Sequence, residues 1–340
     1  MTLERRYRRL LLAYPGPYRR GHGAEIVTTL LEMAAPGQTR PAASDAWHLF
    51  LSGLRQRFRL PSGRPLVLIA AVLITLVTGA FGAAAGSWAA EQTFTDLPGD
   101  AGVEALTRQV AGGGAEFGSD RAASPWWTTM VHAGVDEPSY TPEAAQARLT
   151  AHGWQVTAIQ PRSGTSATFD PATGATVSEA VRSSAFEATR DGLRLQATGY
   201  VRAGHGVVNV QLWPADTGAV APLMIAGAVL GLLAGWLLTA AGAYRLRPLP
   251  TSRRRVVATL TTLALGALAV PAFALWVNVW RVLEHREMPI FTVHSALSAG
   301  PYWSYGTTWL LPQLAAAGLL LSLIAWAVTL RRPPPTPVEA

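Results

Sequence analysis

The side chains that could do chemistry in this chain are seven scattered histidines, and none has a catalytic spacing. They are His22, His48, His132, His152, His205, His285 and His294. No pair has the HExxH spacing that puts two zinc ligands and a general base on one helix face. His285-Arg-Glu287 has the right residue types in the wrong order, and with Glu284 and His294 it offers at most an adventitious site. We interpret it as a solvated loop and expect no metal centre.

Other catalytic motifs are missing as well. There is no Gly-x-Ser-x-Gly elbow, and a chain without lysine has no GKS or GKT phosphate loop. Ser163-Gly-Thr-Ser166 has the composition of a loop. Asp136-Glu137 is an adjacent acidic pair whose side chains point apart, which is typical of a surface turn. We therefore predict no catalytic residue, no cofactor-binding residue and no cofactor, and expect a protein that is not an enzyme.

Four uncharged apolar stretches determine how the other segments of the chain are arranged. Transmembrane helices are predicted at 65–90, 219–244, 256–280 and 307–330. About 20 apolar residues at about 1.5 Å rise cross a hydrocarbon core about 30 Å thick, and each stretch supplies that length. The expected fold is an α-helical integral membrane protein with four transmembrane helices.

The charges on the connecting segments predict the topology. Residues 1–64 hold eleven Arg and four acidic residues, and 245–255 holds five Arg and no acid. Residues 91–218 hold eight Arg and fourteen acids, and 281–306 is neutral. Because Arg-rich segments stay in the cytoplasm, we place 1–64, 245–255 and the tail 331–340 inside and the other two segments outside. The protein is then a multi-pass cell-membrane protein with both termini cytoplasmic. The pI near 10.3 is then explained by the Arg-rich cytoplasmic segments, and no nucleic acid is expected as a partner.

Within the predicted spans, polar residues are few and glycines are regularly spaced. Asn278 and Gln313 lie near the predicted outer ends, where hydrogen bonding to the interface or to a neighbouring helix accounts for them. The lack of ionisable groups at depth argues against an ion-coupled transporter. The four-residue spacing of Gly227, Gly231 and Gly235 fits either a homodimer interface or helix packing within one chain, and we favour the second.

The first 60 residues predict three short helices, separated by Pro15-Gly16-Pro17 and Pro36-Gly37. The second is expected around Ala24–Ala34, and the third from a Ser44 cap to about Leu60. On the third, one face carries Trp47, Phe50, Leu51, Leu54 and Phe58, and Arg55, Arg57 and Arg59 cluster near its end. This face could lie in the lipid headgroup region or pack on the other two helices. We favour packing, because 60 residues bury little surface without it.

The same segment resembles a known type of domain. Its motifs are Arg5-Arg6-Tyr7-Arg8-Arg9-Leu10-Leu11, Tyr14-Pro15, Tyr18-Arg19-Arg20, Gly23, Glu25 and Leu30-Leu31. They resemble the HAAS or permease-prefix domain of actinobacterial membrane proteins, which is often encoded beside PadR-type regulators. The resemblance covers about 60 of 340 residues. It implies a cytoplasmic interaction module that contacts a protein partner through residues 1–60, and it transfers no catalytic residue.

The segment 91–218 has the size of one domain. We expect helices within 99–111 and from Thr141-Pro142, a strand at Trp154–Ile159, and a Gly/Ser/Thr-rich connection at 163–178. Arg190-Asp191-Gly192 between alternating runs predicts a hairpin, and Val207–Trp213 predicts a further strand. Together these elements favour an extracytoplasmic α+β domain with an antiparallel sheet.

The absence of cysteine excludes disulfides, and the Ala, Gly, Arg and Pro bias is typical of a high-GC bacterial genome. From the architecture we hypothesise a non-enzymatic signalling or regulatory protein. It would couple the outer domain to the cytoplasmic helical module, with the lipid bilayer and a cytoplasmic protein as partners. The alternative is a permease-like or accessory subunit of a transport complex.

Overall fold

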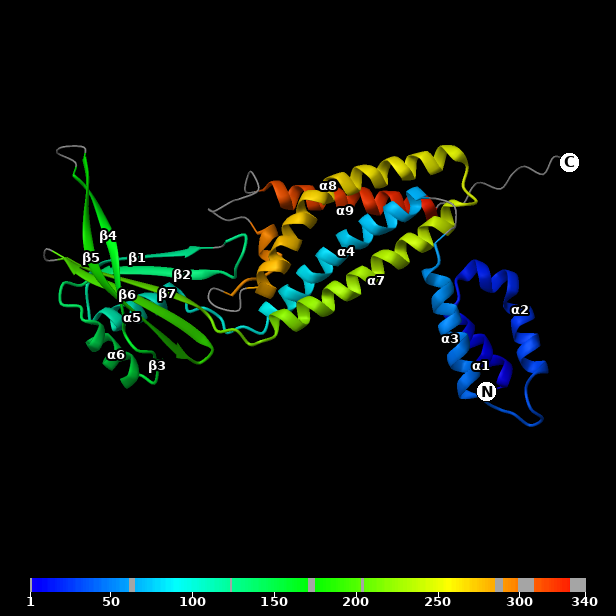
Figure 1. Cartoon of the computed structure of the whole chain (residues 1–340), viewed down its shortest axis with the longest axis horizontal. Coiled ribbons are helices and arrows are strands. Elements are labelled where there is room, and N and C mark those ends of the chain that lie inside the picture. The colour runs from blue at the N-terminus through cyan, green and yellow to red at the C-terminus, as the bar shows by residue number, and fades with distance from the viewer. Residues whose placement is uncertain are drawn as a thin grey trace. The chain divides into compact units, whose positions relative to one another are not determined.

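The computed structural model describes residues 2–60, 65–122, 124–170, 175–202, 205–284, 290–298 and 309–330. Their contacts divide the chain into two compact units. One unit is Met1–Gly82, Ala228–Ala272 and Leu314–Ala340, and the other is Ala83–Gly227 and Phe273–Gln313. Figure 1 labels the helices and strands along the chain. The predicted tail 331–340 lies outside the described residues.

Four helices in the described residues are long and apolar enough to cross a membrane, which confirms this part of the sequence prediction. They are α4 (Pro65–Glu91), α7 (Val220–Leu246), α8 (Thr251–Glu284) and α9 (Leu310–Leu330). Helix α8 begins five residues before the predicted span, because Pro250 precedes it and arginines at 253–255 are good helix formers. It continues as a helix through Pro271.

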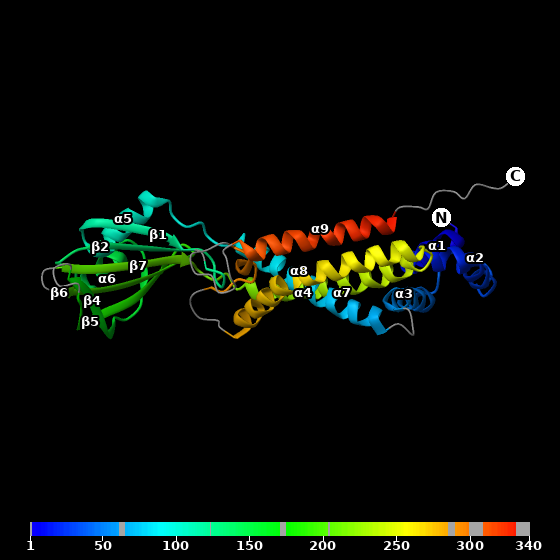
Figure 2. The same ribbon diagram turned by 90° about the horizontal axis from the view of Figure 1, so that it is seen from above.

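Helices α4 and α7 lie side by side (Figure 1, Figure 2) because small residues let their backbones approach. A Cβ added at Gly231 would overlap the carbonyl oxygen of Thr78, and one at Gly235 would overlap the Thr78 hydroxyl. A Cβ added at Gly86 would overlap the carbonyl oxygen of Leu223. Packing within one chain therefore accounts for these three glycines.

Residues 100–214, called the sheet region below, contain a seven-stranded antiparallel sheet and two helices. The strand order is β1-β2-β7-β6-β5-β3, and β4 also pairs with β5. The strands are β1 (Ala115–Ala122), β2 (Met130–Asp136), β3 (Gln155–Val156), β4 (Gln160–Asp170), β5 (Ala175–Arg190), β6 (Leu193–Arg202) and β7 (His205–Pro214). Helices α5 (Asp100–Ala111) and α6 (Pro142–Ala151) pack on the sheet (Figure 1).

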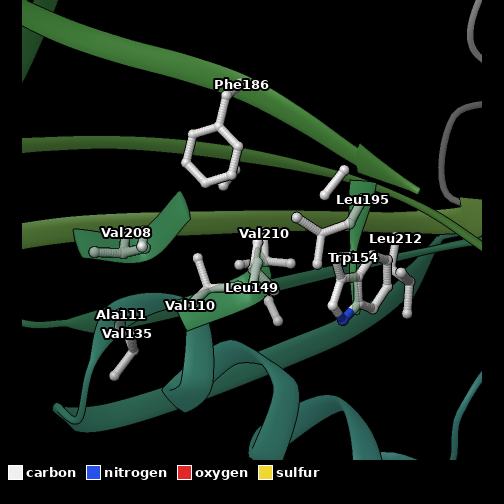
Figure 3. Packing of buried hydrophobic residues seen from close by; sticks show 14 of the residues in the cluster. Val110, Ala111, Val135, Leu149, Trp154, Phe186, Leu195, Val208, Val210 and Leu212 are labelled. Atoms are coloured by element: carbon white, nitrogen blue, oxygen red, sulfur yellow. The ribbon is translucent and has the colours of Figure 1, made fainter. Parts of the chain in front are cut away.

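The core of the sheet region lies between these helices and one face of the sheet. Alternate residues of β2, β5, β6 and β7 point inward, as the two-residue period of a strand requires. Figure 3 shows Phe186, Leu195, Val210 and Leu212 from the strands close to Leu149 of α6. The opposite face is more exposed and polar, with Glu187 and Arg194 paired at 3.3 Å.

Local signals predicted several elements of the sheet region correctly. Thr141 caps α6 by accepting a hydrogen bond from Ala144 N, and the Asp191–Gly192 turn joins β5 to β6. Both turn residues have positive φ, 49° and 76°, as a tight hairpin requires. The connection predicted at 163–178 was wrong, since residues 163–170 of β4 pair with residues 175–182 of β5. Strands β1 and β2 were not predicted, and β3 is only two residues long.

The N-terminal helical region, residues 2–60, contains α1 (Leu3–Leu10), the short 3-10 helix η1 (Leu11–Ala13), α2 (Gly16–Glu32) and α3 (Ala43–Phe58). Its small core is Tyr7, Leu11, Tyr14, Val27 and Leu49. Helix α2 begins eight residues earlier than predicted, because proline in a first turn starts a helix as readily as it ends one. Helix α3 begins before Ser44, after Ala42, and no side chain caps it.

Helix α3 buries a different face from the one expected. Leu49 and Gly53 are buried, and Gly53 lies against Ala13 and Tyr14. Trp47 and Leu51, by contrast, are 62% and 45% exposed. The preferred packing interpretation was therefore wrong for these apolar side chains, because small or aliphatic residues on the opposite face make the closer contact with η1.

Candidate functional site: a polar cluster at the ends of α4 and α8

Polar side chains from distant parts of the chain meet in the second compact unit. We define the polar cluster as Ser87, Glu91, Thr128, Asn278 and His294. Ser87 and Glu91 share one face of α4, since they are four residues apart. Thr128 precedes β2, Asn278 lies on α8, and His294 begins the 3-10 helix η2 (His294–Leu297). The cluster thus connects two long helices with the chain leading into the sheet.

Glu91 and His294 form the ionisable centre of the cluster. His294 Nε2 lies 2.6 Å from Glu91 Oε2, and Thr128 Oγ1 donates to Glu91 Oε1 at 2.5 Å. The side chains of His294 and Glu91 are only 19% and 27% exposed. Both carboxylate oxygens are therefore engaged, and a partly buried charge-assisted contact of this kind is stronger than one at the surface.

Ser87 completes an array of serine, histidine and carboxylate. Its Oγ lies 3.4 Å from His294 Nδ1 and accepts a hydrogen bond from Val293 N at 2.9 Å. In a hydrolase such an array activates the serine as a nucleophile. Here Ser87 is fully buried, so its hydroxyl is not exposed to a substrate in solution. The arrangement therefore favours a structural connection over acyl transfer.

Asn278 anchors the second half of the cluster. It is fully buried, and its Nδ2 donates to Pro125 O at 2.7 Å and to Thr292 O at 3.0 Å. In the sequence Asn278 stands among apolar residues, and it was expected to hydrogen-bond to the membrane interface or to a neighbouring helix. Asn278 therefore holds together the segment before β2 and the segment before η2.

Main-chain contacts reinforce this connection. Thr128 N donates to Ile290 O, and Thr292 N donates to Trp126 O, both at 3.0 Å. Between them Trp127 and Phe291 form an antiparallel bridge. The Arg281 guanidinium lies 4.5 Å from the centre of the Trp126 ring, a cation–π contact that ties α8 to the same segment. A shift of the segment before β2 must therefore disturb α4 and α8.

The sequence prediction recognised only part of this site. His285 and Glu287 lie outside the described residues, and Glu284 ends α8. His294, expected in a solvated loop, is instead paired with Glu91. Within the described residues no group of three or more His, Asp or Glu side chains is placed to hold a metal ion. Ser87, Glu91 and Thr128 were not predicted to be site residues. The sequence feature that could have pointed to this site is Glu91, an acidic residue at the end of an otherwise uncharged helix and four residues after Ser87.

Other predicted residues lie apart from the cluster. Asp136 ends β2 and pairs with His205 at 2.7 Å, whereas Glu137 accepts from Ser139. The hydrogen bond from His205 lowers the pKa of Asp136, and the same contact raises the pKa of His205. His152 Nδ1 lies 2.7 Å from Arg148 O, and Ser163 lies within β4. Gln313 is exposed on α9.

No family model, curated protein or solved structure matches this chain. The resemblance of residues 1–60 to a permease-prefix domain therefore stays a prediction.

Proposed function

We propose that this chain is a non-enzymatic bacterial membrane protein that transmits a signal between its sheet region and its N-terminal helical region. The sheet region would face the outside and receive the input. The N-terminal helical region would contact a cytoplasmic protein. Four apolar helices support a membrane location, and the alternation of Arg-rich and Arg-poor segments supports the orientation.

The observation that carries the proposal is the polar cluster. It links the segment leading into β2 to both α4 and α8 through side-chain and main-chain hydrogen bonds. A change in the sheet region would reach the helices through these contacts, since packed helices shift as units between discrete arrangements. Helix α4 also packs against α7, which contacts the N-terminal helical region.

A contact of α7 supports transmission from the helices to the N-terminal helical region. Trp236 Nε1 donates to Phe58 O, at the end of α3, at 2.8 Å. This hydrogen bond accounts for a tryptophan in the interior of an apolar helix. It gives the N-terminal helical region a direct connection to a membrane helix, so displacement of α7 would move α3.

The test is crosslinking of the tagged full-length protein in its native membrane, beside a variant lacking residues 2–60 and the variant Glu91→Ala. We expect a cytoplasmic partner that is lost with the deletion and crosslinks with altered yield in Glu91→Ala. Glu104→Ala is the control, because Glu104 pairs with Arg108 at the exposed surface of α5. Identical partners and yields in all variants would contradict the proposal. Recovery of an ATP-binding protein would favour the transport alternative.

A further inference from the structure

Helix α3 carries an exposed apolar face that the rest of the described chain leaves uncovered. Trp47 is 62% exposed, Phe50 is 40% exposed and Leu51 is 45% exposed. The rings of Trp47 and Phe50 stack with their centroids 6.0 Å apart. Positions 47, 50 and 51 share one face of a helix, so the side chains form one continuous patch. We call it the α3 apolar face.

The opposite side of α3 is fixed to its own region. Leu49 and Gly53 are buried there, and the Arg57 guanidinium donates to the carbonyl oxygens of Ala13 and Leu12 at 2.6 and 2.5 Å. These contacts set the rotation of α3 about its axis. The α3 apolar face therefore points away from the core of the N-terminal helical region.

Two constraints tie the end of this helix to helices that are apolar enough to cross a membrane. Phe58, the last residue of α3, accepts the hydrogen bond from Trp236, which lies ten residues before the end of α7 at Leu246. At about 1.5 Å per residue, Trp236 is about 15 Å from that end of an apolar helix. In addition, α4 begins at Pro65, so a connection of only six residues, spanning at most about 25 Å, joins α3 to a predicted span.

The charges beside the patch fit an anionic lipid surface. Arg55 and Arg59 are exposed, and they lie four residues apart along one border of the α3 apolar face. Long arginine side chains can place their methylenes along an apolar surface and their guanidinium groups near lipid phosphates. Tryptophan favours this same headgroup level.

We propose that α3 lies in the headgroup layer of the membrane that α4 enters, with Trp47, Phe50 and Leu51 inserted among the lipids and Arg55 and Arg59 beside lipid phosphates. Amphipathic helices of this kind insert their apolar face about 5–10 Å into the boundary between headgroups and acyl chains. The proposal does not depend on the signalling role or on any protein partner.

The test uses the absence of native cysteine, which permits single labels without other changes. The full-length variants W47C, F50C and L51C would each carry a nitroxide in vesicles of phosphatidylcholine and phosphatidylglycerol. D45C and H48C are controls, because both positions are exposed on the same helix but lie off the α3 apolar face. Collisions with oxygen and with a water-soluble nickel chelate, measured by electron paramagnetic resonance, report depth.

We expect labels at 47, 50 and 51 to show high oxygen and low nickel accessibility, and the control labels to show the reverse. Equal nickel accessibility at all five positions would overturn the proposal. Shielding of 47, 50 and 51 from both reagents would indicate protein on this face, and would also overturn it. With R55Q and R59Q combined, the labels should become shallower in vesicles that contain phosphatidylglycerol. An unchanged depth would overturn the assignment of these arginines to lipid phosphates.

Discussion

His294 Nε2 and Glu91 Oε2 lie 2.6 Å apart although 203 residues separate them in the chain. Glu91 ends α4, and His294 lies between α8 and α9. The pair is only partly exposed, and Thr128 and Ser87 bond to its two members. We expect this contact to couple the segment before β2 to the helices energetically as well as geometrically.

The coupling between Glu91 and His294 can be measured with a double-mutant cycle. Glu91→Ala should lower the melting temperature of the full-length protein in detergent, because it removes the carboxylate that accepts from His294 Nε2 and Thr128 Oγ1. Losses of this type are about 1–3 kcal/mol. His294→Ala should cost little more in the Glu91→Ala background, so the two effects should be less than additive.

The exposed pair Glu104–Arg108 is the matched control for that cycle, since it joins a carboxylate and a cation at 2.8 Å on one helix surface. Its coupling should be at most about 0.5 kcal/mol. Additive effects at Glu91 and His294 would show that the observed contact contributes nothing to stability.

Close packing of α4 and α7 predicts a strong effect of a single methyl group. Gly231→Ala should lower the melting temperature, because the new Cβ overlaps the carbonyl oxygen of Thr78 and the helices must separate. Overpacking of this kind costs about 1–3 kcal/mol. Gly266→Ala on α8 is the control, since in the described residues its added Cβ meets no atom within 4 Å outside its own stretch of helix. That substitution should be neutral or stabilising. Equal melting temperatures of the two variants would contradict the close packing of α4 against α7 at Gly231.

The orientation of α3 predicts the outcome of Gly53→Ala. Its added Cβ would lie 2.7 Å from Ala13 Cβ and 2.9 Å from Tyr14 Cδ2, which are too close. The N-terminal helical region should therefore loosen, and limited proteolysis should cleave within residues 2–60 faster than in the unmodified protein. Among the residues that the structure describes, a Cβ added at Gly21 on α2 meets nothing within 4 Å, so Gly21→Ala should leave the cleavage rate unchanged or lower it. If Gly53→Ala is as resistant as Gly21→Ala, α3 does not pack through this face.

The Asp136–His205 pair predicts a pH dependence. Because the pKa of His205 is raised on folding, its contribution is complete below the ordinary value of about 6.5 and disappears as pH rises through the higher folded value. Because the pKa of Asp136 is lowered, its contribution is complete above about 3.8 and disappears as pH falls through the lower folded value. The pair should therefore stabilise most between about pH 4 and 6.5.

The measurement compares melting temperatures of the full-length protein and His205→Gln across this range. The difference should be small, because His205 is 76% exposed, and largest near pH 5 to 6. A difference that grows steadily above pH 8 would have the wrong sign for this mechanism.

Sequence reasoning succeeded where the controlling interactions are local. Uncharged composition alone identified four apolar helices, Thr141-Pro142 marked the start of α6, and Asp191-Gly192 marked a hairpin. In each case the interaction that determines the structure lies within one segment. It is the transfer of apolar side chains out of water for the four helices, a capping hydrogen bond for α6, and a backbone conformation with positive φ for the hairpin.

It failed where an element depends on a distant neighbour. Strand β1 is mostly exposed, so it lacks the alternation that marks a half-buried strand, and only its pairing with β2 defines it. Strand β4 is similarly defined by its register with β5. The polar cluster was missed for the same reason. Glu91 and His294 each resemble an ordinary helix-end or loop residue until the fold brings them together.

The wide sequence separation within the polar cluster also dictates an order of assembly during synthesis. At about 5–20 residues per second, His294 is made about 10–40 s after Glu91. In that interval the sheet region, α7 and α8 must all be produced, so α4 spends its first seconds with an unpaired carboxylate at its end. The cluster closes only after His294 has been made. Until then Glu91 lacks its histidine partner, so the contact that joins α4 to the segment before η2 is among the last of the described contacts to form.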